Sequence, residues 1–335
     1  MGTTIGQELN EEAYHHAQTG CVIVKRKALG YIWSHGRDRL DLLHRLSTND
    51  LLGMSANEVK STVLTNPIGR TVDYLIVLNI ENKSLIITSP GKSEIVFQWI
   101  IKYIFFQDDV TLKFPDESLI QTGLYGPKAH EVVAKITPDF SSLSHNQSFT
   151  INDSAWIMRV PPPGGIGYEI VSDATTTQEL VERAKTAGAV KSPSSLYELL
   201  RIEAGLPGAG LEIDTSYIPL EIGLRDAVSF TKGCYTGQEI IARLDSRGKL
   251  AKTLVGLRSS DKIPIGASLQ APNKSYGIVT SSTYSPKLGW IGLGLVKPTV
   301  CEPGTTLSVT KDKISGSASI SALKAIVGPS KPPSM

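Results

Sequence analysis

The stretch Lys232-Gly233-Cys234-Tyr235-Thr236-Gly237-Gln238-Glu239 is the most informative part of this chain, for its fold as well as its function. It contains two glycines, a thiol, a phenol and an amide, and is too polar to form a core strand. Glycine allows positive φ and a close approach of other groups to the backbone. Apolar segments flank the stretch at 227–230 and 240–242. A polar loop held between buried elements is typical of a binding or reaction site.

The three cysteines, Cys21, Cys234 and Cys301, are far apart in sequence. This spacing gives no zinc or self-contained iron–sulfur site, and the odd, sparse count favours a reducing compartment. We expect Cys21 and Cys301 to be small buried residues. Cys234 is the candidate reactive residue, because Lys232 and Arg243 lie near it in sequence and positive charge favours the thiolate. No histidine nearby in sequence could serve as its base, so an inert cysteine in a tight turn remains the alternative.

The composition is that of an ordinary globular protein of 335 residues, 41% hydrophobic and 20% charged, and the length allows two or three domains. A net charge of +2 does not indicate direct binding of nucleic acid. No apolar run approaches the roughly 20 residues of a membrane span. The N-terminal segment, with Glu8, Glu11 and Glu12, lacks a secretory signal. We therefore expect a cytoplasmic protein, with the mitochondrial matrix left open if the source is eukaryotic.

The first half of the chain alternates between strand and helix patterns. Strands are expected at 29–33, 62–65, 72–80 and 84–88, and helices at 38–46 and 93–106. Asp38 can cap the first helix. The second helix carries a stripe that we expect in the core, formed by Ile95, Val96, Trp99, Ile100 and Tyr103. This alternation predicts an α+β layer.

The second half begins with a sharp break at 161–165, Pro-Pro-Pro-Gly-Gly. A strand at 167–171 contains Glu169, and helices follow at 176–188 and from Ser192, a candidate cap. Short strands separated by Gly, Pro and Asn turns then predict an antiparallel barrel or sandwich. We assign residues 1–248 to the α+β region, 249–328 to the β-barrel and 329–335 to a disordered tail.

The polar stretch at 232–239 resembles the signature loop of the YgfZ-type, folate-binding proteins of iron–sulfur cluster assembly and repair. These proteins belong to the glycine-cleavage T-protein, or aminomethyltransferase, superfamily. Further stretches resemble the family's segments in the same order, at 43–50, 64–70, 200–207 and 219–224. The resemblance implies interleaved α+β subdomains around a central folate hole, with a C-terminal antiparallel β-barrel.

The resemblance also implies tetrahydrofolate as the cofactor. Glu169 matches the glutamate of a Gly-Tyr-Glu segment that binds the pterin, and a carboxylate can accept two hydrogen bonds from such a ring. Arg201 matches an arginine suited to the glutamate tail of folate or to holding the site. Without the resemblance, Glu169 would be interpreted as a solvent residue of an edge strand and Arg201 as a helix-surface ion pair. Within the signature loop, the candidate cofactor-binding residues are Lys232, Tyr235 and Gln238.

One departure from the superfamily concerns an acidic residue that acts in aminomethyl transfer. Its expected place falls near Ile95 or Val96, and Glu94 would lie differently on the helix. The absence of this acid, together with Cys234, favours the iron–sulfur branch.

Three functions follow as hypotheses. The first is a folate-binding accessory factor whose partners are iron–sulfur client enzymes or assembly factors; the resemblance implies that such factors support tRNA-modifying radical enzymes. The second is a folate-dependent one-carbon transferase, such as an aminomethyltransferase or demethylase, in which Glu94, Asp73 or another carboxylate replaces the missing acid. The third is a scaffold without catalysis, in which a basic run meets RNA or a polyglutamate tail. That run, which we expect to be a solvated face, comprises Arg243, Arg247, Lys249 and Lys252.

Overall fold

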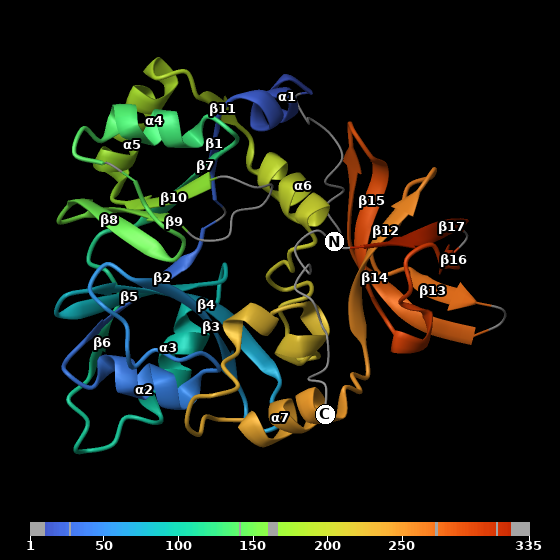
Figure 1. Cartoon of the computed structure of the whole chain (residues 1–335), viewed down its shortest axis with the longest axis horizontal. Helices are drawn as coiled ribbons and strands as arrows, with labels where there is room; N and C mark the ends of the chain where they lie inside the picture. The colour runs from blue at the N-terminus through green and yellow to red at the C-terminus, as the bar shows by residue number, and fades with distance from the viewer. Residues whose placement is uncertain are drawn as a thin grey trace.

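The computed structural model describes residues 11–26, 28–140, 142–159, 167–271, 274–312 and 314–322. Figure 1 shows two sheets, one above the other, on one side of the molecule and a barrel on the other. The helix α6 (Ser194–Ala204) lies between the six-stranded sheet and the barrel, where it contacts β14, β15 and β1. This arrangement is the α+β fold with a C-terminal barrel that the sequence predicts.

The six-stranded sheet has the order β11-β1-β7-β10-β9-β8. Its strands are β1 (Val22–Lys25), β7 (Ile120–Tyr125), β8 (Gln147–Asn152), β9 (Ala155–Arg159), β10 (Gly167–Ser172) and β11 (Val190–Ser192). Helices α4 (Ala129–Ile136) and α5 (Ala174–Thr186) cover one face, where Leu124 and Ile170 pack against Val133 and Leu180. The residues that alternate with Leu124 and Ile170 therefore point to the opposite face.

The five-stranded sheet is antiparallel and has the order β3-β4-β5-β2-β6. Its strands are β2 (Gly30–His35), β3 (Val59–Thr65), β4 (Thr71–Ile80), β5 (Lys83–Thr88) and β6 (Thr111–Lys113). Helices α2 (Arg39–Leu46) and α3 (Ser93–Ile101) contribute to the core of this unit. A second apolar cluster, which includes Tyr31, Ile87 and Trp156, joins this sheet to the six-stranded one. Because all five strands fall between β1 and β7 in sequence, the two units are interleaved.

The C-terminal barrel is closed, in the order β12-β15-β14-β13-β16-β17. Its strands are β12 (Thr253–Ser259), β13 (Ser268–Ala271), β14 (Lys274–Ser285), β15 (Gly289–Val296), β16 (Thr306–Lys311) and β17 (Ile314–Ser321). The remaining elements are α1 (Glu11–Thr19), α7 (Gln238–Arg247) and the short 3₁₀ helices Pro219–Ile222, Arg225–Ala227 and Pro298–Val300.

Several local predictions need correction. Helix α3 ends at Ile101 rather than 106, and Ile95 lies on its exposed side instead of in the core. Asp38 makes no side-chain cap bond; its carboxylate instead accepts a hydrogen bond from the Asp109 amide. Ser192 belongs to β11, so α6 starts after Pro193. Cys21 is buried as expected, whereas Cys301 is only half-buried.

The predicted break at 161–165 and the predicted tail at 329–335 lie outside the described residues. In the part of the chain that the structure covers, no helix is long and apolar enough to cross a membrane.

Candidate functional site

Glu169 lies in the middle of the six-stranded sheet rather than at its edge. Its strand β10 pairs with β7 on one side and β9 on the other, and the residue is 2% exposed. The interpretation as a solvent residue of an edge strand is therefore wrong. Alternation along β10 places Glu169 on the face opposite the one that α4 and α5 cover.

Tyr125 reaches Glu169 by folding back over Gly123 on the same strand. Gly123 is the register partner of Glu169 in the antiparallel pair, and a Cβ on Gly123 would overlap the Tyr125 phenol. With that space open, the Tyr125 hydroxyl donates a 2.5 Å hydrogen bond to Glu169 Oε1. Burial, followed by the charge of Glu169, raises the pKa of Tyr125 well above its ordinary value, so the phenol remains a donor.

Arg26 and Gln121 complete the contacts of this carboxylate. Arg26 Nη1 lies 2.9 Å from Glu169 Oε1, and Gln121 Nε2 donates to Oε2 at 2.9 Å. The Arg26 guanidinium also stacks on the ring of Tyr197 from α6, 3.4 Å from its centroid. Burial acts to lower the pKa of Arg26, but the neighbouring Tyr197, Glu169 and Tyr125 outweigh it and raise that pKa, so Arg26 is cationic.

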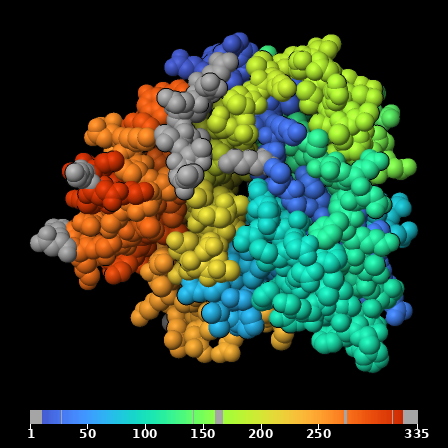
Figure 2. All heavy atoms as spheres, turned by 180° about the vertical axis from the view of Figure 1, so that it is seen from behind, coloured from blue at the N-terminus to red at the C-terminus, as the bar shows by residue number. Residues whose placement is uncertain are grey.

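The Glu169 cluster, defined as Arg26, Gln121, Tyr125, Glu169 and Tyr197, lies where the two sheets and α6 meet. Figure 2 shows these segments from behind, with the barrel on one side of the molecule and the two sheets on the other. The other four members were not among the site residues predicted from the sequence. Only the Gly-x-Tyr spacing on a strand hinted at Tyr125, and nothing marked Arg26, Gln121 or Tyr197, because their proximity depends on sheet order.

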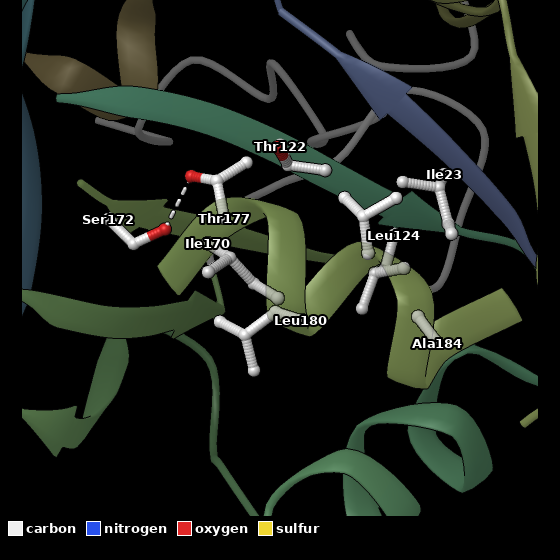
Figure 3. Close-up of a pocket in the computed structure, with 9 residues that line it drawn as sticks. Ile23, Thr122, Leu124, Ile170, Ser172, Thr177, Leu180 and Ala184 are labelled. Atoms are coloured by element: carbon white, nitrogen blue, oxygen red, sulfur yellow. Dashed lines mark hydrogen bonds between the residues drawn. The ribbon is translucent and has the colours of Figure 1, made fainter. Parts of the chain in front are cut away.

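A pocket on the other face of the same sheet is a separate feature. It lies between the sheet and α5 and is lined mainly by apolar side chains, among them Leu124, Ile170 and Leu180 (Figure 3). Its polar members are Thr122, Ser172 and Thr177, and the last two bond each other at 2.7 Å. This pocket contains no titratable group, so the Glu169 cluster is the better candidate for a polar ligand.

Lys232 anchors the signature loop to the end of α2. Its Nζ donates to the main-chain oxygens of His44, Ser47 and Asn49 at 2.5, 2.8 and 2.8 Å. A cation at the carboxyl end of a helix also complements the helix dipole. Burial lowers the pKa of Lys232 to about 8. With these bonds in place, Lys232 positions the loop, and any contact with a cofactor would compete with them.

The signature loop also joins two other stretches that the sequence singles out. Thr65 Oγ1 donates to the Thr236 carbonyl at 2.6 Å, and a Cβ on Gly237, whose φ is +84°, would collide with the backbone of Asn66 and Gly69. The Thr236 amide donates to the Arg45 carbonyl at 3.3 Å. Stretches 43–50, 64–70 and 232–239 therefore meet in space.

Within this loop the predicted site residues differ in exposure. Cys234 is exposed and Gln238, the first residue of α7, is half-buried. Tyr235 is buried in an apolar cluster with Val228 and Ile241, and burial raises its pKa to about 12. Arg243 forms a 2.8 Å ion pair with Glu239 on α7, so its charge is already partnered.

Arg201 is buried rather than a surface residue of its helix. Its guanidinium donates to Glu198 at 2.8 Å, the Leu206 carbonyl at 3.2 Å and Ser281 of β14 at 3.1 Å. Ser281 in turn donates to the buried Glu212 at 2.7 Å. This network joins α6 to the barrel and indicates that Arg201 positions the elements around the site. The predicted residues thus form three clusters, centred on Glu169, Lys232 and Arg201.

The place expected for the acid of aminomethyl transfer holds no carboxylate. Val96 is fully buried, Ile95 is exposed, and the exposed Glu94 bonds Gln98 at 3.0 Å. Asp73, in contrast to Glu94, is fully buried on β4. Its Oδ2 accepts a 2.9 Å hydrogen bond from the Ser89 amide, at the end of β5.

Asp73 Oδ1 has no hydrogen-bond partner among the residues that the structure describes. Burial raises the pKa of the Asp73 carboxyl above its ordinary value, and its contacts with Ser89 act against that rise. Of the two carboxylates named as replacements for the missing acid, Glu94 and Asp73, Asp73 is therefore the buried one.

Comparison with known proteins agrees with this architecture. A chloroplastic protein of Arabidopsis thaliana with a provisional transferase name is 30% identical over 316 residues, covering 92% of this chain and 72% of its own. An aminomethyltransferase of Geobacillus kaustophilus is 31% identical over 315 residues, covering 89% and 85%. The crystal structure of the glycine cleavage system aminomethyltransferase T from Bartonella henselae has a TM-score of 0.84 at 20% identity, covering 94% and 88%, and supports the fold.

Family models match most of the chain. The GCVT N-terminal domain matches residues 4–232, and the glycine cleavage T-protein C-terminal barrel domain matches residues 252–323. The chain therefore belongs to the glycine-cleavage T-protein superfamily.

Proposed function

We propose that this protein binds a reduced folate at the Glu169 cluster and acts as an accessory factor for the assembly or repair of iron–sulfur enzymes, as YgfZ-type proteins do. The observation that carries the folate assignment is the buried Glu169 carboxylate on a central strand. Next to it, Gln121 Oε1 is a buried acceptor without a hydrogen-bond partner among the described residues. A buried polar cluster at the meeting of several elements is a common setting for a small-molecule site.

The residues of the cluster fit the pterin of tetrahydrofolate. A pterin presents N–H donors at its 2-amino group and N3, next to the carbonyl oxygen at position 4. The buried Gln121 Oε1 has no hydrogen-bond partner among the described residues, so it is an acceptor available to such a donor. Glu169 and Gln121 would hold the donor edge, and Tyr197 would support the Arg26 side chain. Bound folate supplies a carrier for one-carbon units.

Cys234 is the proposed functional thiol. It lies exposed in a loop that Lys232 ties to α2, so the protein presents it without burying it. The thiol could serve as a ligand to a transient cluster, as a reductant or as a one-carbon acceptor. The partners are iron–sulfur client enzymes or assembly factors, including those that support tRNA-modifying radical enzymes, with no direct contact to nucleic acid. We retain 1–248 and 249–328 as domain boundaries and a cytoplasmic or matrix location.

The second candidate function is a folate-dependent one-carbon transferase. Its support is Asp73, a buried carboxyl with a raised pKa next to Ser89, together with relatives named aminomethyltransferase. The apolar Val96 at the expected place of the acid argues for the accessory factor instead.

Turnover and cellular function separate the two candidates. An accessory factor should bind tetrahydrofolate, show little turnover with amine or methyl donors, and lose its support of iron–sulfur enzymes in cells on Cys234→Ala. Sustained turnover that Asp73→Asn abolishes and Cys234→Ala leaves intact would establish the transferase. Full cellular function of the Cys234→Ala protein would favour the scaffold.

A further inference from the structure

The Glu169 cluster is electrically balanced before any ligand arrives. The Arg26 guanidinium and the Glu169 carboxylate are 2.9 Å apart, with side chains 15% and 2% exposed. A buried carboxylate without such a partner would attract a cation strongly, because few water molecules screen it. The ion pair therefore removes the driving force for binding a positively charged group.

The hydrogen bonds of the cluster leave a defined pattern of donors and acceptors. Glu169 Oε1 accepts from both Arg26 and Tyr125, whereas Oε2 accepts from Gln121 among the described residues. A carboxylate has about four lone-pair positions, so Oε2 retains acceptor capacity. The second acceptor is Gln121 Oε1, which is buried and unpartnered within the described chain.

Arg26 adds donors to these acceptors. Both of its hydrogen bonds to described residues come from Nη1, at 2.9 Å to Glu169 and 3.4 Å to the Tyr125 hydroxyl. Guanidinium has five N–H groups in a rigid fork, so Nε and Nη2 remain as donors with respect to the described residues. Stacking on Tyr197 fixes the plane in which these donors lie.

We propose that Arg26 determines the specificity of this site, selecting a neutral heterocyclic edge with two N–H donors beside a carbonyl oxygen and rejecting a cationic diamino edge. This inference rests on the proposed folate site. The acceptors of Glu169 and Gln121 suit the two N–H donors, and the Arg26 N–H groups that bond no described residue suit the carbonyl oxygen. If an amino group replaces that oxygen, its N–H donors face the N–H donors of Arg26, and no hydrogen bond can form between them. The amino group also favours protonation of the ring, and the cationic ring is then repelled by the cationic Arg26.

The matched ligands for a test are folic acid and aminopterin, which differ only in the oxygen or amino group at position 4. Titration calorimetry measures the affinity of each for the wild type, Arg26→Met and a control, Arg183→Met, whose arginine is exposed on α5. The wild type and the control should prefer folic acid. In Arg26→Met the Glu169 carboxylate loses its cation, so the ratio of the two affinities should shift toward aminopterin by about tenfold or more. An unchanged ratio in a folded Arg26→Met protein would overturn the proposal.

Arg26→Met can also fail to fold, because it leaves a buried carboxylate without its counterion. The double variant Arg26→Met/Glu169→Gln removes both charges, and glutamine keeps the size of the Glu169 side chain. Circular dichroism checks its fold, and it should bind the two ligands with similar affinity. A double variant that retains the wild-type preference would contradict the proposal.

The two proposals fail in distinguishable ways. If the wild type binds neither ligand and no reduced folate, both the proposed folate site and the proposed role of Arg26 are wrong. If the wild type binds folic acid and the preference is insensitive to Arg26, the folate site stands and the role of Arg26 is wrong.

Discussion

Gly123 lies directly opposite Glu169 in the six-stranded sheet, and its missing side chain leaves the space that the Tyr125 phenol occupies. The phenol then donates to the carboxylate of Glu169. A glycine in the middle of a strand normally weakens it, so a close approach of this kind accounts for its presence. The shape of the candidate site thus depends on the absence of a side chain at Gly123.

Gly123→Ala should disturb this arrangement. The new methyl group overlaps the phenol, so Tyr125 must move and its hydrogen bond to the buried carboxylate is lost, at a cost of about 1–3 kcal/mol. Urea unfolding measures the loss, and Tyr125→Phe, which removes only the hydroxyl, should reproduce part of it. Gly53→Ala serves as the control, because a Cβ there meets open space. Equal stability of Gly123→Ala and the wild type would contradict this account of Gly123.

Lys232→Met should loosen the signature loop. The variant leaves the carbonyls of His44, Ser47 and Asn49 without their shared donor, and we expect a loss of about 1–3 kcal/mol of unfolding free energy. Hydrogen exchange should rise at 232–239 and at the end of α2 together. The exposed Lys102 provides the matched control, Lys102→Met, which should change neither quantity. Protection that is unaltered in Lys232→Met would show that the loop is held by other contacts.

The titration of the buried Asp73 carboxyl should make the stability of the protein depend on pH. Burial raises its folded-state pKa above the value of the unfolded chain, so the folded protein binds more protons between the two pKa values. Its contribution to stability therefore falls as the pH rises through that window, starting near pH 4, and the penalty is absent below it. Relative to the wild type, Asp73→Asn should therefore gain stability as the pH rises above about 4.

Urea unfolding at a series of pH values measures this difference. The control Asp153→Asn, at an exposed aspartate, should follow the wild type at every pH. A difference between Asp73→Asn and the wild type that is constant across the series would show that Asp73 titrates as it does in the unfolded chain.

The sequence predicts the architecture well because its motifs and patterns are local. The alternation at 72–80 and 84–88, the turns after 249 and the ordered family stretches are properties of short segments, and the structure confirms the α+β fold with a C-terminal barrel. Helix α3 was predicted too long because apolar residues continue past Ile101, although the chain leaves the helix there.

The surroundings of the candidate site could not be predicted in the same way. Arg26 follows β1, Gln121 and Tyr125 lie on β7, and Tyr197 lies on α6, so their meeting with Glu169 depends on sheet order and register. Single-sequence patterns do not specify such non-local pairing. The same limit applies to Arg201, whose burial results from the packing of α6 against the barrel.

The most direct test of the account is a calorimetric titration of tetrahydrofolate into the wild type and Glu169→Gln, with Glu182→Gln on the exposed face of α5 as the control. Circular dichroism first establishes that each variant is folded. We predict that the wild type and the control bind, and that Glu169→Gln binds at least about tenfold more weakly, because it loses a charge-assisted acceptor. Equal affinity of Glu169→Gln would contradict the pterin assignment, and no binding by the wild type would mean that the fold persists without the folate ligand.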